Sequence, residues 1–158
     1  MSQPTRPAEL IAAFAARGLT VATAESLTGG LLAATLTSVP GASVVFRGGV
    51  VAYATDLKAT LLGVDPALLD RGGPVDADVA AAMAGGVRHR LSASFGVAVT
   101  GVAGPDAQDG HPVGEVYVAV AGPHRVVVAG HRLTGGRAAI REATVVVALD
   151  ALTREHEV

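Results

Sequence analysis

Short runs rich in β-branched residues alternate with helix-forming segments along this chain, and that alternation restricts the possible folds more than any other feature. The runs that we expect to form strands span residues 19–24, 43–54, 95–99, 114–121 and 125–132. The segments that we expect to form helices span residues 5–17, 27–38, 56–62, 77–91 and 137–154. Strands interleaved with helices predict a three-layer α/β/α sandwich. The last two strands are consecutive, so the sheet should be mixed, although mostly parallel.

Local signals refine these boundaries. Gly48 and Gly49 interrupt the second strand run and predict a bulge or bend there. Asp76 is expected to cap the long alanine-rich helix, and residues 65–74 before it are expected to form a loop. No internal repeat, low-complexity tract or linker divides the chain.

The length and composition indicate one domain. A chain of 158 residues can bury a substantial core but is too short for two comfortable domains, so we expect residues 1–158 to form a single domain. Half of the residues are apolar and only 3% are aromatic, so Ala, Val and Leu must build the core. The absence of cysteine excludes disulfides, thiolate catalysis and cysteine-bound zinc.

The charge balance argues against two classes of partner. A net charge of −2 and a pI near 6.2 provide no positive patch for nucleic acid or for an anionic membrane. No apolar run approaches the ~20 residues of a membrane span. The first residues lack the cationic start and unbroken apolar stretch of a signal peptide. We therefore expect a cytoplasmic protein.

Residues 23–30, Thr-Ala-Glu-Ser-Leu-Thr-Gly-Gly, form a polar turn between a predicted strand and a predicted helix. Such a turn exposes a side chain and free backbone N–H groups at the carboxyl end of a strand. Ser26 could therefore be a nucleophile beside an oxyanion or anion site. The alternative is that Ser26 only caps the following helix, as serines often do.

Lys58 is the single lysine beside eleven arginines. An ammonium group can lose its proton where a guanidinium cannot. If Thr55 caps the short helix that follows, Lys58 lies in its first turn, where the helix dipole lowers the lysine pKa and burial lowers it further. A neutral lysine beside a serine hydroxyl is a known way to activate a nucleophile. The alternative is a solvated lysine neutralised by Asp56.

Two more polar residues fall at predicted strand ends. Tyr53 and Thr100 both lie where a strand gives way to a loop, as Ser26 does. Strand ends of an open α/β sheet gather at one edge, where ligands bind. Residues 100–106 form a second glycine-rich turn that could present N–H groups to a phosphate, although such turns have low specificity.

The remaining basic residues are less specific. The histidines have no metal-ligand spacing with one another or with a carboxylate, which makes a zinc site unfavourable; they are His89, His111, His124, His131 and His156. Arg137 and Arg141 lie one helical turn apart at the start of the last predicted helix. They suit a phosphate group, or else form a solvated helix face.

Four ordered motifs carry a resemblance to a known family. They are Thr-Ala-Glu-Ser-Leu-Thr-Gly-Gly at 23–30, Val-Ala-Tyr-Ala-Thr-Asp-Leu-Lys at 51–58, Thr-Gly-Val-Ala-Gly-Pro-Asp at 100–106 and Pro-Val-Gly-Glu-Val-Tyr at 112–117. Together they resemble the CinA C-terminal-domain family, whose stand-alone members include nicotinamide-nucleotide amidase, also called nicotinamide mononucleotide deamidase. The resemblance spans about residues 7–153.

The resemblance implies a three-layer α/β/α fold with a mixed sheet, usually as a homodimer. It also implies cofactor-free hydrolysis of the carboxamide of nicotinamide mononucleotide to nicotinate mononucleotide and ammonia, in pyridine-nucleotide salvage. Ser26 would be the nucleophile, Lys58 its base, and Tyr53 and Thr100 would assist in positioning and proton transfer. The two glycine-rich turns would hold the nucleotide and the oxyanion, through residues that include Thr28, Gly29, Gly30, Gly101 and Gly104.

This chain departs from the family's pattern at three positions. Thr55 stands where the family commonly has Asn, Asp76 where it has Ser, and Gly136 where it has Asp before an arginine. Thr55 can still cap a helix. The changes at 76 and 136 are expected to weaken a phosphate or dimer contact and to leave the Ser26/Lys58 pair intact.

Two other functions stay open at this stage. One is a catalytically silent nucleotide- or partner-binding module, since members of the family also occur fused to a larger domain and are linked to competence and DNA-damage responses. The other is an amidase that acts on a different amide. The stand-alone length and the retention of Ser26 and Lys58 favour the enzyme over the module.

Overall fold

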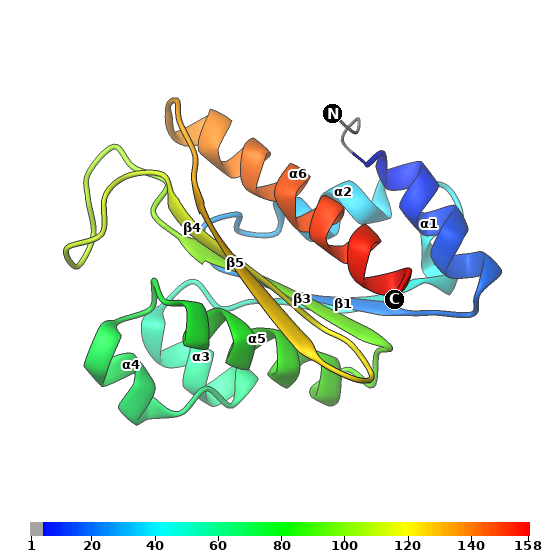
Figure 1. Cartoon of the computed structure of the whole chain (residues 1–158), viewed down its shortest axis with the longest axis horizontal. Helices are drawn as coiled ribbons and strands as arrows, with labels where there is room; N and C mark the ends of the chain where they lie inside the picture. Colours follow the sequence, from blue (N-terminus) through cyan, green and yellow to red (C-terminus); the bar gives the residue numbers. More distant parts are fainter. Residues whose placement is uncertain (1–4) are drawn as a thin grey trace.

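A five-stranded mixed sheet lies between two layers of helices in the computed structural model, which describes residues 5–158 (Figure 1). The strand order is β2-β1-β3-β4-β5, with β1 parallel to β2 and β3, and β4 antiparallel to β3 and β5. The strands are β1 (Val21–Glu25), β2 (Phe46–Val51), β3 (Phe95–Gly101), β4 (Glu115–Ala121) and β5 (Val126–Arg132). The predicted three-layer α/β/α architecture is confirmed.

Helices cover both faces of the sheet (Figure 1). One layer contains α1 (Pro7–Ala16), α2 (Leu31–Thr37) and α6 (Arg137–His156), and the other contains α3 (Thr55–Leu62), α4 (Pro66–Gly72) and α5 (Ala77–Arg90). A short 3₁₀ turn, η1 (Ala42–Val44), leads into β2. None of the helices in residues 5–158 has the length and apolar character needed to span a bilayer.

The two faces of the sheet are built from side chains of different size. Alternate residues of a strand point to opposite faces, and here the face toward α1, α2 and α6 carries mainly valines, whereas the face toward α5 carries mainly alanines. Small side chains let α5 approach the sheet closely: a Cβ on Gly96 would lie 2.2 Å from the Ala84 carbonyl oxygen. The predicted core of Ala, Val and Leu is confirmed.

The second predicted helix begins later than expected. α2 starts at Leu31 rather than at residue 27, because Gly29 and Gly30 have positive φ angles of 57° and 106°. Those angles are strained for any residue with a Cβ, and they extend the turn by four residues. The longer turn separates Ser26 from the helix, so Ser26 does not cap it.

Residues 65–74, expected to be a loop, contain the helix α4. Asp65 caps it by accepting a hydrogen bond from the Ala67 N–H at 2.9 Å, and Pro66 is its first residue. An Asp–Pro pair is a recognised helix-start signal, so the prediction of a loop was wrong although the signal was present.

Two other local predictions have different outcomes. Asp76 caps α5 through its carboxylate, which accepts from the N–H groups of Asp78 and Val79. Thr55, in contrast, is the first residue of α3 and not its cap, since the cap position belongs to Ala54, which has no capping side chain.

The predicted glycine irregularity in the second strand is confirmed. Phe46 and Gly48 pair with consecutive residues of β1, so Arg47 is an extra, bulged residue. A Cβ at Gly49 would lie 2.3 Å from the Thr23 hydroxyl oxygen, so the Thr23 side chain would have to shift to admit any larger residue. The bulge and the close approach bring β2 against β1, and β2 ends two residues before Tyr53.

Candidate active site

The carboxyl ends of the three parallel strands β2, β1 and β3 meet at one edge of the sheet, and a pocket of about 130 Å³ lies there. This volume suits a ring-sized group, so any larger part of a ligand would lie at the opening of the pocket. The pocket is lined by Ser26, Leu27, Tyr53, Lys58, Pro74, Val75, Thr100, Gly101, Val102, Ala103, Gly104, Asp106, Gln108 and Arg137. The four residues singled out at strand ends and on α3 are thus brought together.

Ser26 and Lys58 are in direct contact at the pocket. The Lys58 Nζ lies 3.0 Å from the Ser26 Oγ, although 32 residues separate them in the chain. Ser26 follows the last residue of β1, and Lys58 is the fourth residue of α3. Lys58 also donates to the carbonyl oxygens of Ala52 at 2.7 Å and Tyr53 at 3.4 Å. The distance between the amine and the hydroxyl is short enough for direct proton transfer.

Burial lowers the pKa of Lys58 from 10.5 to about 8. Its side chain is fully buried, and no carboxylate in residues 5–158 lies within ion-pair distance of its Nζ. An ammonium group that has lost water and gained no counter-charge is destabilised relative to the neutral amine. Roughly a tenth of the lysine is therefore neutral at pH 7, and a neutral lysine can accept a proton from serine.

Glu25 holds the turn that carries Ser26. Its buried carboxylate accepts hydrogen bonds from the N–H groups of Leu32 at 2.8 Å and Ala33 at 3.0 Å, at the start of α2. A carboxylate at this position also interacts favourably with the helix dipole. Sequence analysis missed this residue, although a glutamate at the end of an apolar strand signals a buried partner.

Tyr53 and Arg137 lie together on the rim of the pocket. The Tyr53 side chain is 59% exposed, and its hydroxyl accepts a hydrogen bond from the Arg137 Nη2 at 3.2 Å. The Arg137 Nη1 donates to the Gly104 carbonyl oxygen at 2.5 Å. The Tyr53 hydroxyl is therefore bonded to an arginine and not to Ser26, and Arg137 bridges two sides of the opening.

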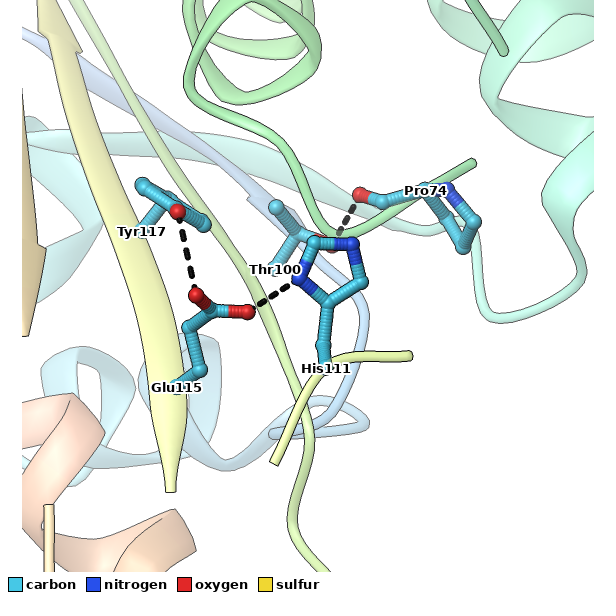
Figure 2. A network of polar contacts seen from close by, with 5 residues as sticks. All are labelled: Pro74, Thr100, His111, Glu115 and Tyr117. Carbon is cyan, nitrogen blue, oxygen red and sulfur yellow. Dashed lines mark hydrogen bonds and ion pairs between the residues drawn. The ribbon is translucent and has the colours of Figure 1, made fainter. Parts of the chain in front are cut away.

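Thr100 lines the opposite wall, and its hydroxyl donates to the Pro74 carbonyl oxygen at 2.8 Å (Figure 2). Beside it, the Glu115 carboxylate pairs with His111 and accepts a hydrogen bond from the Tyr117 hydroxyl at 3.4 Å. Burial raises the pKa of Tyr117, and the negative charge of Glu115 raises it further. This network ties the loop between β3 and β4 to the strands behind the pocket.

The substrate-binding residues named from the sequence fall into two groups. Gly101, Gly104 and Arg137 line the pocket. Arg141 is not among the lining residues and donates to two backbone carbonyls of the Ser26 turn. Thr28, Gly29 and Gly30 belong to that turn and also lie outside the lining. Asp106 and Gln108 also line the pocket. Asp106 ends the glycine-rich motif at 100–106 but was given no role from the sequence, and Gln108 lies beyond that motif and was missed.

In the part of the chain that the structure describes, no three His, Asp or Glu side chains are placed to hold a metal ion. His111 does have a carboxylate partner, Glu115, four residues further on, but this is a pair only.

The fold and the pocket define a class: a three-layer α/β/α domain with a buried serine–lysine pair at the carboxyl edge of its parallel strands. Residues 5–156 match the sequence model of the family described as the CinA C-terminal domain. The chain belongs to the CinA C-terminal domain family, as the four motifs indicated.

Relatives with known sequences and structures agree with this assignment. A CinA-like protein of Frankia casuarinae is 55% identical over 87% of this chain, and a CinA-like protein of Geobacter sulfurreducens is 51% identical over 89%. The chain spans only about a third of the length of these curated relatives, with coverage of 32% and 34%. Among solved structures, the competence/damage inducible protein CihA of Agrobacterium tumefaciens has a TM-score of 0.90 and 41% identity, with 98% of each chain covered.

Proposed function

We propose that this domain hydrolyses the carboxamide of nicotinamide mononucleotide to nicotinate mononucleotide and ammonia, with Ser26 as nucleophile and Lys58 as base. The observation that carries the proposal is the 3.0 Å contact, inside a pocket, between the Ser26 hydroxyl and Lys58. Lys58 is buried, and no carboxylate in residues 5–158 forms an ion pair with it. The substrate comes from the resemblance of the four motifs to nicotinamide-nucleotide amidases.

The proposed reaction uses one proton carrier twice. The neutral Lys58 amine takes the hydroxyl proton as the Ser26 Oγ attacks the carboxamide carbon, and a negative oxygen develops that backbone N–H groups can stabilise. Lys58 then gives this proton to the carboxamide nitrogen, the C–N bond breaks and ammonia departs. The acyl group remains bound to the Ser26 Oγ as an ester. Water next attacks the ester carbon while Lys58 accepts a proton from it, and the acid is released as Ser26 regains its hydrogen.

The direct test measures ammonia release from nicotinamide mononucleotide by the purified protein, alongside nicotinamide, nicotinamide riboside and a panel of aryl amides. Turnover of the mononucleotide supports the proposal. If the protein hydrolysed only another amide, the proposed Ser26/Lys58 mechanism would stand and the proposed substrate would be wrong. Binding of the mononucleotide without turnover of any amide would overturn the proposal in favour of a catalytically silent binding module.

The rate should depend on pH through Lys58. Because its pKa is lowered to about 8, and only the neutral amine acts as base, kcat/KM should rise about tenfold per pH unit below that value and level off above it. Steady-state rates between pH 6 and 9.5 would measure this, with substrate binding followed over the same range as the control. A flat profile between pH 6.5 and 8 would contradict the assignment of Lys58 as base.

Arg137 should bind the phosphate group. Two of its five N–H donors are used by Gly104 and Tyr53, which leaves donors free at the pocket opening. Replacement by alanine is expected to raise KM for nicotinamide mononucleotide by about 10- to 100-fold, the usual effect of losing a charge-assisted hydrogen bond, with kcat changed less than about threefold. The phosphate-free nucleoside is the matched control, and an equal loss on both substrates would exclude a phosphate contact.

A further inference from the structure

The turn that carries Ser26 leaves only some of its N–H groups free. The Ser26 N–H donates to the Val99 carbonyl oxygen at 3.1 Å and continues the pairing of β1 with β3. The Gly29 N–H donates to the Ser26 carbonyl oxygen, also at 3.1 Å. Within residues 5–158, the N–H groups of Leu27, Thr28 and Gly30 have no hydrogen-bond partner, and those of Leu27 and Thr28 are the nearest to Ser26 along the chain. These two groups therefore remain available to a negative oxygen formed next to Ser26.

Arg141, on α6, holds the carbonyl side of this turn. Its Nε donates to the Leu27 carbonyl oxygen at 3.0 Å, and its Nη2 donates to the Thr28 carbonyl oxygen at 2.9 Å. The same guanidinium lies against Gly29, since a Cβ there would be 3.7 Å from the Arg141 Nη2. Both bonds are made to the backbone, so they constrain the path of the turn rather than one of its side chains.

The planarity of the peptide bond converts these contacts into an orientation. In a trans peptide the C=O of one residue points opposite to the N–H of the next. Binding of the Leu27 carbonyl by Arg141 therefore directs the Thr28 N–H away from Arg141. Binding of the Ser26 carbonyl by Gly29 likewise fixes the direction of the Leu27 N–H. For the Leu27 and Thr28 N–H groups, the carbonyl of the same peptide unit is therefore held by a hydrogen bond.

We infer that Arg141 is a positioning residue: it orients the backbone N–H donors of the Ser26 turn toward the oxyanion and takes no part in binding phosphate. This inference rests on the proposed role of Ser26 as nucleophile, although it does not depend on which amide is hydrolysed. It separates the two arginines that the sequence presents as a pair, because Arg137 lines the pocket whereas Arg141 is bound behind the turn.

A fluorophosphonate probe tests this role independently of the substrate. The Ser26 Oγ forms a bond to phosphorus as the P–F bond breaks, fluoride leaves, and Lys58 takes the hydroxyl proton. The phosphoryl oxygen uses the same N–H donors as a carboxamide oxyanion does. Arg141→Ala should label at least about tenfold more slowly than the wild type, while its affinity for nicotinamide mononucleotide stays within about twofold. Arg141→Lys, and millimolar guanidinium added to Arg141→Ala, should each recover part of the labelling rate.

Arg90→Ala is the matched control. Arg90, the last residue of α5, also donates to two consecutive carbonyls, those of Thr60 and Leu61 near the end of α3, and it is not among the residues that line the pocket. This variant should lose a comparable amount of thermal stability and label at the wild-type rate. Equal slowing in both variants would reduce Arg141 to a general structural role and overturn the inference.

The remaining outcomes are also decisive. If Arg141→Ala labels normally but binds the mononucleotide at least about tenfold more weakly, Arg141 is a phosphate ligand and the inference is wrong. A wild type that does not label would overturn it too, because Ser26 would not be reactive. A wild type that labels but does not hydrolyse nicotinamide mononucleotide removes only the proposed substrate, and the slowing in Arg141→Ala still supports the positioning role.

Discussion

Replacing Lys58 with methionine is expected to lower the rate of amide hydrolysis at least about a thousandfold, because Lys58 is the only side chain in residues 5–158 that is hydrogen-bonded to the Ser26 hydroxyl. Methionine fills a similar volume and removes the only buried amine in residues 5–158. Removal of a member of a nucleophile–base pair typically has an effect of this size. The rate of ammonia release from nicotinamide mononucleotide at pH 8 measures it.

The same variant should fold at least as well as the wild type. A buried lysine whose pKa is lowered carries a cost at neutral pH, since the unfolded chain binds the proton more readily than the folded one. Methionine removes that cost, so the melting temperature at pH 7 should stay or rise. Leu62→Met, at another buried position of α3, is the control and should retain activity. If Lys58→Met kept more than about a tenth of the wild-type activity, the assignment of Lys58 as the base would be refuted.

Lys58→Arg distinguishes the charge from the base. Arginine keeps a positive charge but cannot release a proton at accessible pH. If the lysine acted only by attracting a negatively charged substrate, the arginine variant would keep most of its activity. We expect it to be as inactive as the methionine variant, which would assign the effect to proton transfer.

Ser26→Ala is expected to abolish both amide hydrolysis and fluorophosphonate labelling, and to leave the affinity for nicotinamide mononucleotide within about threefold of the wild type. The hydroxyl oxygen forms the covalent bond, so nothing replaces it, whereas binding depends on the walls and rim of the pocket. Lys58 keeps its 2.7 Å contact with the Ala52 carbonyl oxygen in this variant. Ammonia release, mass spectrometry of the labelled protein and calorimetric titration are the three measurements.

Ser38→Ala is the matched control for this experiment. The Ser38 hydroxyl donates to the Thr35 carbonyl oxygen at the exposed end of α2, and Ser38 is not among the residues that line the pocket. It should retain full activity and full labelling. Labelling of Ser26→Ala at the wild-type rate would show that another nucleophile reacts, and the assignment of Ser26 would then be withdrawn.

Most of the architecture was predictable because its signals are local. The strand runs and the helices α1, α5 and α6 were placed to within a few residues, since hydrophobic periodicity follows directly from side-chain direction in each element. The late start of one helix and the omission of another also have local causes. α2 starts late because of two adjacent glycines with positive φ, and α4 was overlooked behind an Asp–Pro start.

The sequence predicted which residues lie at the pocket better than it predicted the hydrogen bonds that they form. Residues at the carboxyl ends of parallel strands must share an edge, so Ser26, Tyr53 and Thr100 could be grouped from sequence alone. Their hydrogen-bond partners could not be predicted, since a hydroxyl can donate or accept and bonds to whichever group packing brings near it. Tyr53 thus bonds to Arg137, and Thr100 to the carbonyl of Pro74.

The sequence by itself determined the order of the five strands, the family, and a single lysine with the chemistry that its arginines lack. The tertiary structure alone decided that this lysine is stripped of water, has no carboxylate partner in residues 5–158, and lies 3.0 Å from Ser26. The reason is physical: periodicity and turn signals act over a few neighbouring residues, whereas a lowered pKa arises from desolvation by distant parts of the chain. The local pattern identifies the amine, whereas packing lowers its pKa.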